Sequence, residues 1–160
     1  MHVRATTRED LAAVDALLAR SYPKLLKDDY PPSVLVTALP LISRAQPNLL
    51  RSGTYYLVET GARRLLGAGG WSRDQQVRDL GHIRHVVTDA TVTRRGVGRL
   101  LLGYALSEAR AQGIVQMECW STFTAEPFYH AMGFETVGPI DVPLQPGITF
   151  PAIRMKQRLL

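Results

Sequence analysis

The sequence predicts a mixed α/β fold, and three observations carry this prediction. The expected elements run in the order strand, helix, helix, strand, strand, strand, helix, strand, helix, strand and strand. The central strands follow one another through short turns, which is typical of an antiparallel meander. A strand, a helix and another strand over residues 81–120 then form a βαβ unit, whose crossover should be right-handed. No repeat, low-complexity tract or long linker interrupts the 160 residues, so we expect one domain over residues 1–160.

The first third of the chain is expected to hold one strand and two helices. Residues 2–6 alternate between polar and apolar side chains, which predicts the first strand. Thr7 suits a helix N-cap, and apolar residues then recur at helical spacing to about Arg20. Five prolines between positions 23 and 47 punctuate the next stretch, where a short helix is expected over residues 33–43.

The remaining elements are separated by turns, several of them rich in glycine. Gly61 begins the turn of a predicted hairpin, and Gly113 suits the C-cap of a predicted helix. The expected strands are 54–60, 64–72, 81–88, 114–120, 134–138 and 150–159, and the expected helices are 96–112 and 125–132.

Composition and charge narrow the classes of partner. The net charge of +5 favours anionic partners, such as nucleic acid or a phosphorylated cofactor. No basic tail and no recognition motif for nucleic acid appears, so we expect no nucleic-acid partner. We also expect no membrane partner, because no apolar run approaches the roughly 18 residues of a membrane span. Cys119 is the sole cysteine and the N-terminus lacks the apolar core of a signal peptide, so the expected location is the cytoplasm.

The segment "TRRGVGRLLLGYAL" at residues 93–106 is the strongest local signal for binding. The first turn of a helix has backbone N–H groups without intrahelical partners, and together with the helix dipole they favour an anion. Glycines let a phosphate approach this backbone closely. The segment lacks the patterns of a P-loop and of a dinucleotide fingerprint. Taken alone, it fits a pyrophosphate site or a solvated basic turn.

Two motifs together resemble the GCN5-related N-acetyltransferase (GNAT) superfamily. The acetyl-CoA loop of that family reads Q/R-x-x-G-x-G/A, and residues 93–98 match it as T-R-R-G-V-G, with Thr93 in place of Gln or Arg. The family's A-x-x-F/Y-Y-x-x-x-G-F motif matches "AEPFYHAMGF" at residues 125–134. The resemblance implies a central, mostly antiparallel twisted sheet of about 6–7 strands with a splayed parallel pair, flanked by about 4 helices.

The resemblance also implies acetyl-CoA as co-substrate and direct transfer of its acetyl group to a primary amine, with a small molecule favoured as acceptor. No metal site is expected. Acetylation of a protein N-terminus or lysine and a non-catalytic acyl-CoA sensor are the alternatives. Pantetheine is expected along the strand before the loop, and pyrophosphate on the loop and helix start. The expected cofactor residues are Val86, Val87, Thr88, Arg94, Arg95, Gly96, Val97, Gly98 and Arg99.

Tyr129 matches the family tyrosine that protonates the departing thiolate, although a packed aromatic residue is the alternative. His82 is the expected base, directly or through a water, because histidine titrates near neutral pH. Strand alternation would place His82, Arg84, Val86 and Thr88 on one face and His85, a weaker candidate, on the other. A water chain without a side-chain base is the alternative. Cys119 is expected to be a small core residue rather than a nucleophile.

The acceptor end is the least specific part of the sequence. Asp28 and Asp29 suit an ammonium group or are solvated loop charges, and Tyr30 follows them in the same "KDDY" stretch. Trp71 ends the glycine-rich stretch "GAGGW" and is expected either at the acceptor wall or in the core. A homodimer is expected only by analogy with relatives.

Overall fold

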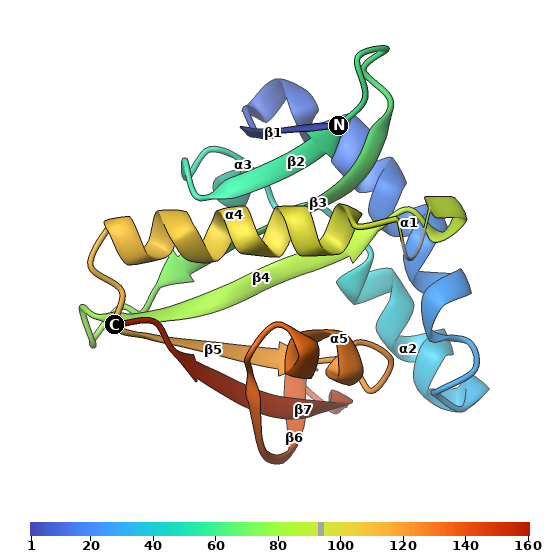
Figure 1. The fold of residues 1–160 in the computed structure, drawn as a ribbon. Coiled ribbons are helices and arrows are strands. Elements are labelled where there is room, and N and C mark those ends of the chain that lie inside the picture. The colour runs from blue at the N-terminus through green and yellow to red at the C-terminus, as the bar shows by residue number, and fades with distance from the viewer. Residues whose placement is uncertain (93–94) are drawn as a thin grey trace.

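A seven-stranded sheet, in the order β1-β2-β3-β4-β5-β7-β6, organises the computed structural model, which describes residues 1–92 and 95–160 (Figure 1). Among the described pairs, β4 and β5 run parallel and the others antiparallel. This confirms the predicted mixed sheet with its single parallel pair. The strands are β1 (His2–Ala5), β2 (Tyr55–Glu59), β3 (Leu65–Arg73), β4 (Leu80–Thr88), β5 (Gln116–Ser121), β6 (Glu135–Gln145) and β7 (Ile148–Arg158).

The helices differ from the expected set in number and length. They are α1 (Leu11–Leu26), α2 (Pro32–Ile42), α3 (Pro47–Leu50), α4 (Val97–Ala111) and α5 (Glu126–Ala131). Helix α1 passes through Pro23 instead of ending near Arg20, because Tyr22 and Leu26 continue its buried face. The short α3 was not expected. Within the described parts of the chain, no helix has both the length and the apolar character needed to cross a membrane.

Helices cover both faces of the sheet (Figure 1). On one face α4 buries Val97, Leu101 and Ala105, which recur every fourth residue and so form one stripe of the helix. On the other face α1 and α2 lie over a second core that includes Leu17 and Ala38. The sheet is thus the middle of three layers, and anything that passes between its strands passes between the two cores.

A bulge interrupts the pairing of β3 with β4. Arg84 lies opposite Gly70 and Val87 lies opposite Ala68, so the intervening stretch has one more residue on β4 than on β3. His85 has φ 45°, which is unusual for a residue other than glycine. The expected alternation along β4 is therefore wrong beyond Arg84, because the extra residue reverses the faces that follow.

Candidate active site

The parallel pair β4 and β5 separates after a short stretch of pairing. The ladder joins Leu80 to Gln116 and ends where His82 meets Glu118. Strand β4 continues to Thr88 and β5 to Ser121 without pairing to each other. The fork leaves backbone groups of β4 without a strand partner on that side, so they are available to bond an extended ligand.

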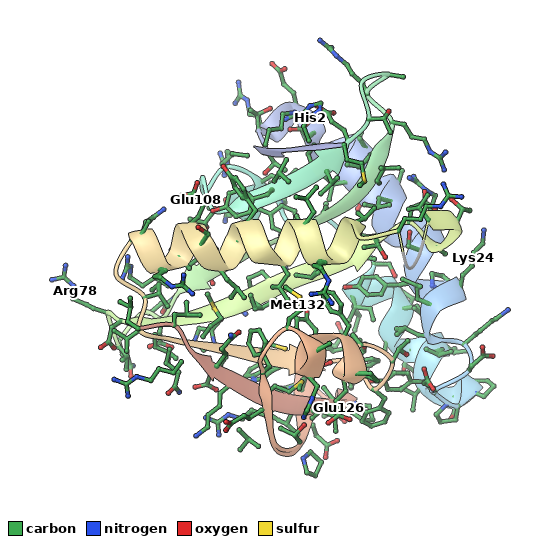
Figure 2. The ribbon with its side chains drawn as sticks, viewed as in Figure 1. His2, Lys24, Arg78, Glu108, Glu126 and Met132 are labelled. Carbon is green, nitrogen blue, oxygen red and sulfur yellow. The ribbon has the colours of Figure 1, made fainter. Side chains whose placement is uncertain are left out.

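A cleft of about 1020 Å³ occupies this fork. Its walls come from both faces of the sheet: Gly98 and Phe128 lie on the α4 side, and Leu25 and Ile42 lie on the α1 and α2 side. The volume is at the upper end of the roughly 300–1,000 Å³ typical of small-molecule sites. Charged side chains on the outside, such as Lys24 and Arg78, point away from the sheet (Figure 2). Because its lining comes from both faces of the sheet, the cleft offers a separate surface to each of two ligands.

The start of α4 lies at this cleft. Gly96 is the N-cap residue with φ 81° and ψ 4°, a left-handed conformation that glycine adopts without steric cost. The N–H groups of Val97, Gly98 and Arg99 precede the first helical hydrogen bond, which Leu100 N–H donates to Gly96 O at 3.0 Å. Gly96 and these three residues line the cleft. The helix start thus offers unpaired donors and the positive end of its dipole to an anion.

The rest of the expected loop is placed less completely. Arg95 is exposed and directly precedes Gly96, but it does not line the cleft. Thr93 and Arg94 lie outside the described residues. The expected contribution of Arg94, and the effect of threonine at position 93, therefore stay predictions.

The expected pantetheine segment lies along the same cleft. Val86, Val87 and Thr88 all line it. Val86 covers Gly69 so closely that a Cβ at Gly69 would lie 2.7 Å from Val86 Cγ2. The glycine in β3 therefore lets Val86 sit at the bulge, which fixes the path of β4 beside the cleft.

Tyr129 lines the cleft from α5 but is largely buried. Its ring packs edge-on against Phe128 and Phe134. Met132, at the end of α5, lies between α5 and α4 and packs against the core under α4 (Figure 2). Burial raises the pKa of the Tyr129 hydroxyl well above its ordinary value, so this group holds its proton at neutral pH.

The two histidines of β4 have different surroundings. His82 Nε2 donates to Asp74 Oδ1 at 2.8 Å, and this bond holds the pKa of the Asp74 carboxyl at about 2. His82 is not among the residues that line the large cleft. His85 does line it, where Gln46 Nε2 donates to His85 Nε2 at 3.4 Å. Burial, and then the neighbouring charge of Arg84, lower the pKa of His85 below 6.5, which keeps the ring neutral near pH 7.

The residues expected at the acceptor end do not themselves line the cleft, although Asp29 and Tyr30 contact residues that do, Thr124 and Phe150. Asp28 and Asp29 are exposed, and Thr124 Oγ1 donates to Asp29 Oδ2 at 2.7 Å. Tyr30 is buried and stacks on Phe123 with a centroid separation of 4.7 Å. Its hydroxyl donates to Pro151 O at 2.8 Å. Asp29 and Tyr30 thus fasten the α1–α2 connection onto the C-terminal half, and an acceptor contact by this stretch stays a prediction.

Trp71 and Cys119 belong to the core under α4. The indole of Trp71 is 1% exposed and donates to Tyr56 Oη at 3.2 Å, so the core alternative for this residue replaces the acceptor-wall alternative. Cys119 is 2% exposed, and burial raises the pKa of its thiol. A buried, protonated thiol is a poor nucleophile. This agrees with the prediction that Cys119 is a small core residue.

Three of the cleft residues that were not predicted from the sequence bring polar or aromatic groups. Arg84 and Gln46 bring polar groups, and Trp120 brings an indole that is 47% exposed. Arg84 shares a strand with the expected base, so its proximity to the site was accessible from the sequence. Gln46 and Trp120 carry no comparable signal, because only the tertiary fold brings them to the fork.

Comparison with known proteins gives the family. The family model for the acetyltransferase (GNAT) domain matches residues 33–156. No curated protein sequence matches the chain significantly. A GCN5-related N-acetyltransferase from Rhodopseudomonas palustris is similar in structure, with a TM-score of 0.79, 17% identity, and coverage of 98% of this chain and 94% of that one.

Two further structures of this kind contain coenzyme A. One is the PaiA N-acetyltransferase of Thermoplasma acidophilum, with a TM-score of 0.74, 14% identity and 98% coverage of each chain. The other is Rv2747 of Mycobacterium tuberculosis, with a TM-score of 0.65, 20% identity and 100% coverage of each chain. At these identities the structures establish a shared fold, and the family model covers most of the sequence. The chain therefore belongs to the GNAT acetyltransferase family of acyl-CoA-dependent transferases.

Proposed function

We propose that this protein transfers the acetyl group of acetyl-CoA directly to a primary amine of a small molecule. The observation that carries the proposal is the cleft in the fork of β4 and β5, which has the start of α4 on one side and lining residues from both faces. Pyrophosphate would bond the N–H groups of Val97, Gly98 and Arg99. Pantetheine would lie along Val86–Thr88, with its amides on the unpaired edge of β4.

The chemistry requires one proton to leave the amine and another to reach the sulfur. The amine nitrogen attacks the thioester carbonyl carbon, a C–N bond forms and the C–S bond breaks. The Tyr129 hydroxyl would donate its proton to the thiolate, giving free CoA. Its position in the cleft supports this role, and the hydroxyl carries its proton before the bond breaks, as an acid must.

The base is better supported at His85 than at His82. His85 lines the cleft and has a lowered pKa, so its neutral ring can take the amine proton at Nε2 once the long 3.4 Å bond from Gln46 gives way. His82 is occupied by Asp74 and would act only through a water. The base role of His82 stays a prediction that substitution of each histidine tests separately.

Other features of the proposal follow from the sequence. We propose one acyltransferase domain over residues 1–160, because the described strands share one sheet. The single, buried Cys119 suits a reducing compartment, which supports the cytoplasm as location. A homodimer stays an expectation to be tested by light scattering.

Release of free CoA thiol over a panel of amines tests the proposed function. Calorimetry with acetyl-CoA first establishes binding of the donor. Turnover with small amines, and not with lysine-containing peptides, is the expected result. Binding without turnover of any amine would favour the acyl-CoA sensor, and turnover of peptides alone would favour a protein acetyltransferase. No heat with acetyl-CoA would overturn the acetyltransferase and the acyl-CoA sensor alike, because each must bind the donor.

A further inference from the structure

We infer that the acceptor is an apolar amino acid, with its carboxylate bound by the guanidinium of Arg84. This inference rests on the proposed function and adds the substrate class to it. It is carried by the charge of the cleft, the surroundings of Arg84, the bulge in β4 and the apolar wall beside it.

The described part of the cleft lining has cationic side chains and no anionic one. Among the described residues that line it there is neither aspartate nor glutamate, whereas Arg84 and Arg99 do line it. Arg99 lies at the start of α4, on the side proposed for the cofactor pyrophosphate. A polyamine would place additional ammonium groups in this cleft without a carboxylate partner, which is costly for a charge removed from water. An acceptor that carries its own anion suits the cleft better.

Arg84 is oriented but not neutralised. Its Nε donates to Ser72 Oγ at 2.8 Å, which ties the side chain to β3. Over residues 1–92 and 95–160 no carboxylate forms an ion pair with it. Asp74 influences it only at longer range and is itself bonded to His82. The two terminal nitrogens of Arg84 are thus suited to receive a carboxylate in a two-point contact.

The bulge brings Arg84 and His85 to one site. In a regular strand, consecutive side chains point to opposite faces. Here both residues line the same cleft, and His85 has the positive φ of 45°. A molecule with an amine close to its carboxylate can therefore present the amine to the His85 side and the carboxylate to Arg84. An amino acid has this arrangement, because one carbon carries both its amine and its carboxylate.

The wall on this side of the sheet is apolar. Leu25 and Ile42 from α1 and α2, and Val142 and Leu144 from β6, line the cleft and pack against the second core. Trp120 adds a partly exposed indole from β5. A side chain of the leucine or phenylalanine kind would bury apolar surface there, whereas an acidic or basic side chain would lose water without gaining a partner.

Matched pairs of amines test the inference in the CoA-release assay. The pairs are L-leucine with 3-methylbutylamine and L-phenylalanine with 2-phenylethylamine, which differ only in the carboxylate. Spermidine and L-aspartate serve as charge controls. We expect each amino acid to exceed its decarboxylated partner in kcat/KM by about 10- to 100-fold, the range for a hydrogen-bonded charged group. A preference for the plain amines or for spermidine would overturn the inference.

Substitution of Arg84 separates recognition from folding. Arg84→Gln should remove most of the preference within each pair. The ratio of the two members is the readout, because loss of the Arg84 charge also acts on the pKa of His85 and so shifts the turnover of both members alike. Arg84→Lys should restore part of the preference, because it keeps the charge without the fork of donors. Arg73→Gln, on the exposed end of β3, is the matched control and should change neither the ratio nor the turnover. An equal loss for both members of each pair in Arg84→Gln would show a structural role instead.

A binding experiment decides the inference independently of turnover. N-acetyl-L-leucine and N-(3-methylbutyl)acetamide, which represent the two products, are titrated calorimetrically into protein saturated with CoA. Tighter binding of the acid, lost in Arg84→Gln, supports the carboxylate site even if no amine is acetylated and the proposed activity fails. Equal binding, or no binding of the acid, overturns the inference even if plain amines are acetylated and the proposed function stands.

Discussion

Substitution of Gly98 by valine tests whether the start of α4 holds the cofactor. A Cβ at this position would lie 3.2 Å from two ring carbons of Phe128 and 3.6 Å from Thr88 Cγ2. Valine adds two more methyl groups at this tight contact, and overpacking of this kind costs about 1–3 kcal/mol. Phe128 and Thr88 both line the cleft, so their displacement acts directly on the space proposed for acetyl-CoA.

The expected loss in binding follows from this energy. If the complex bears most of the cost, the KM for acetyl-CoA rises about 5- to 150-fold, since each 1.4 kcal/mol is a factor of ten. Gly103 provides the control, because it lies in the same helix with no atom within 4 Å of an added Cβ. Gly103→Ala should raise the free energy of unfolding by about 0.5–1 kcal/mol and leave the KM unchanged. A folded Gly98→Val protein with the parental KM would refute the placement of the cofactor.

Four further substitutions test individual roles. Tyr129→Phe should lower kcat by about 10²- to 10⁴-fold with little change in acetyl-CoA affinity, measured by CoA release and calorimetry; an unchanged kcat would remove Tyr129 as the acid. With His85 as base, kcat/KM should fall as the pH drops through its pKa, which lies below 6.5, because protonation removes the acceptor lone pair. His85→Gln should abolish this acidic limb and His82→Gln should keep it; the reverse pattern would restore His82 as base. Asp89→Asn should destabilise the protein by about 1–3 kcal/mol in urea unfolding and raise the KM for acetyl-CoA, because it removes the charge that pairs with Arg20 Nη2 at 3.2 Å just before the glycine loop; unchanged stability and KM would contradict this anchoring role.

Periodicity was sufficient for most elements but not for the acceptor site. The apolar spacing along α4 directly reports the face that it buries, so both the helix and its position were predictable. The contacts of Tyr30 depend on Phe123 and Pro151, more than 90 residues away, and no local pattern encodes them. Asp29 likewise meets Thr124 only through the fold. Charge near the expected acceptor end therefore did not reveal these contacts.

The error along β4 has a different origin, because the sequence does contain a trace of the bulge. Prediction by alternation assumes one residue on β4 for each residue on β3, and Gly69 breaks this rule by facing His85 and Val86 together. A glycine inside a predicted strand indicates a bulge or a close approach of backbone. The stretch "GAGG" therefore indicated a possible bulge, although a run of glycines does not identify the segment that packs against it.

Each glycine of that stretch makes room for a different part of the site. A Cβ at Gly67 would lie 2.9 Å from Val97 Cγ1 at the start of α4, and one at Gly69 would lie 2.7 Å from Val86. At Gly70 it would lie 2.1 Å from the carbonyl oxygen of Thr54, which leaves no room for any side chain. Since Gly67 and Gly69 set the positions of α4 and of the bulge, the same short strand segment positions the proposed cofactor donors and the neighbouring Arg84 and His85. The glycines of β3 therefore serve the site through close packing, without themselves lining the cleft.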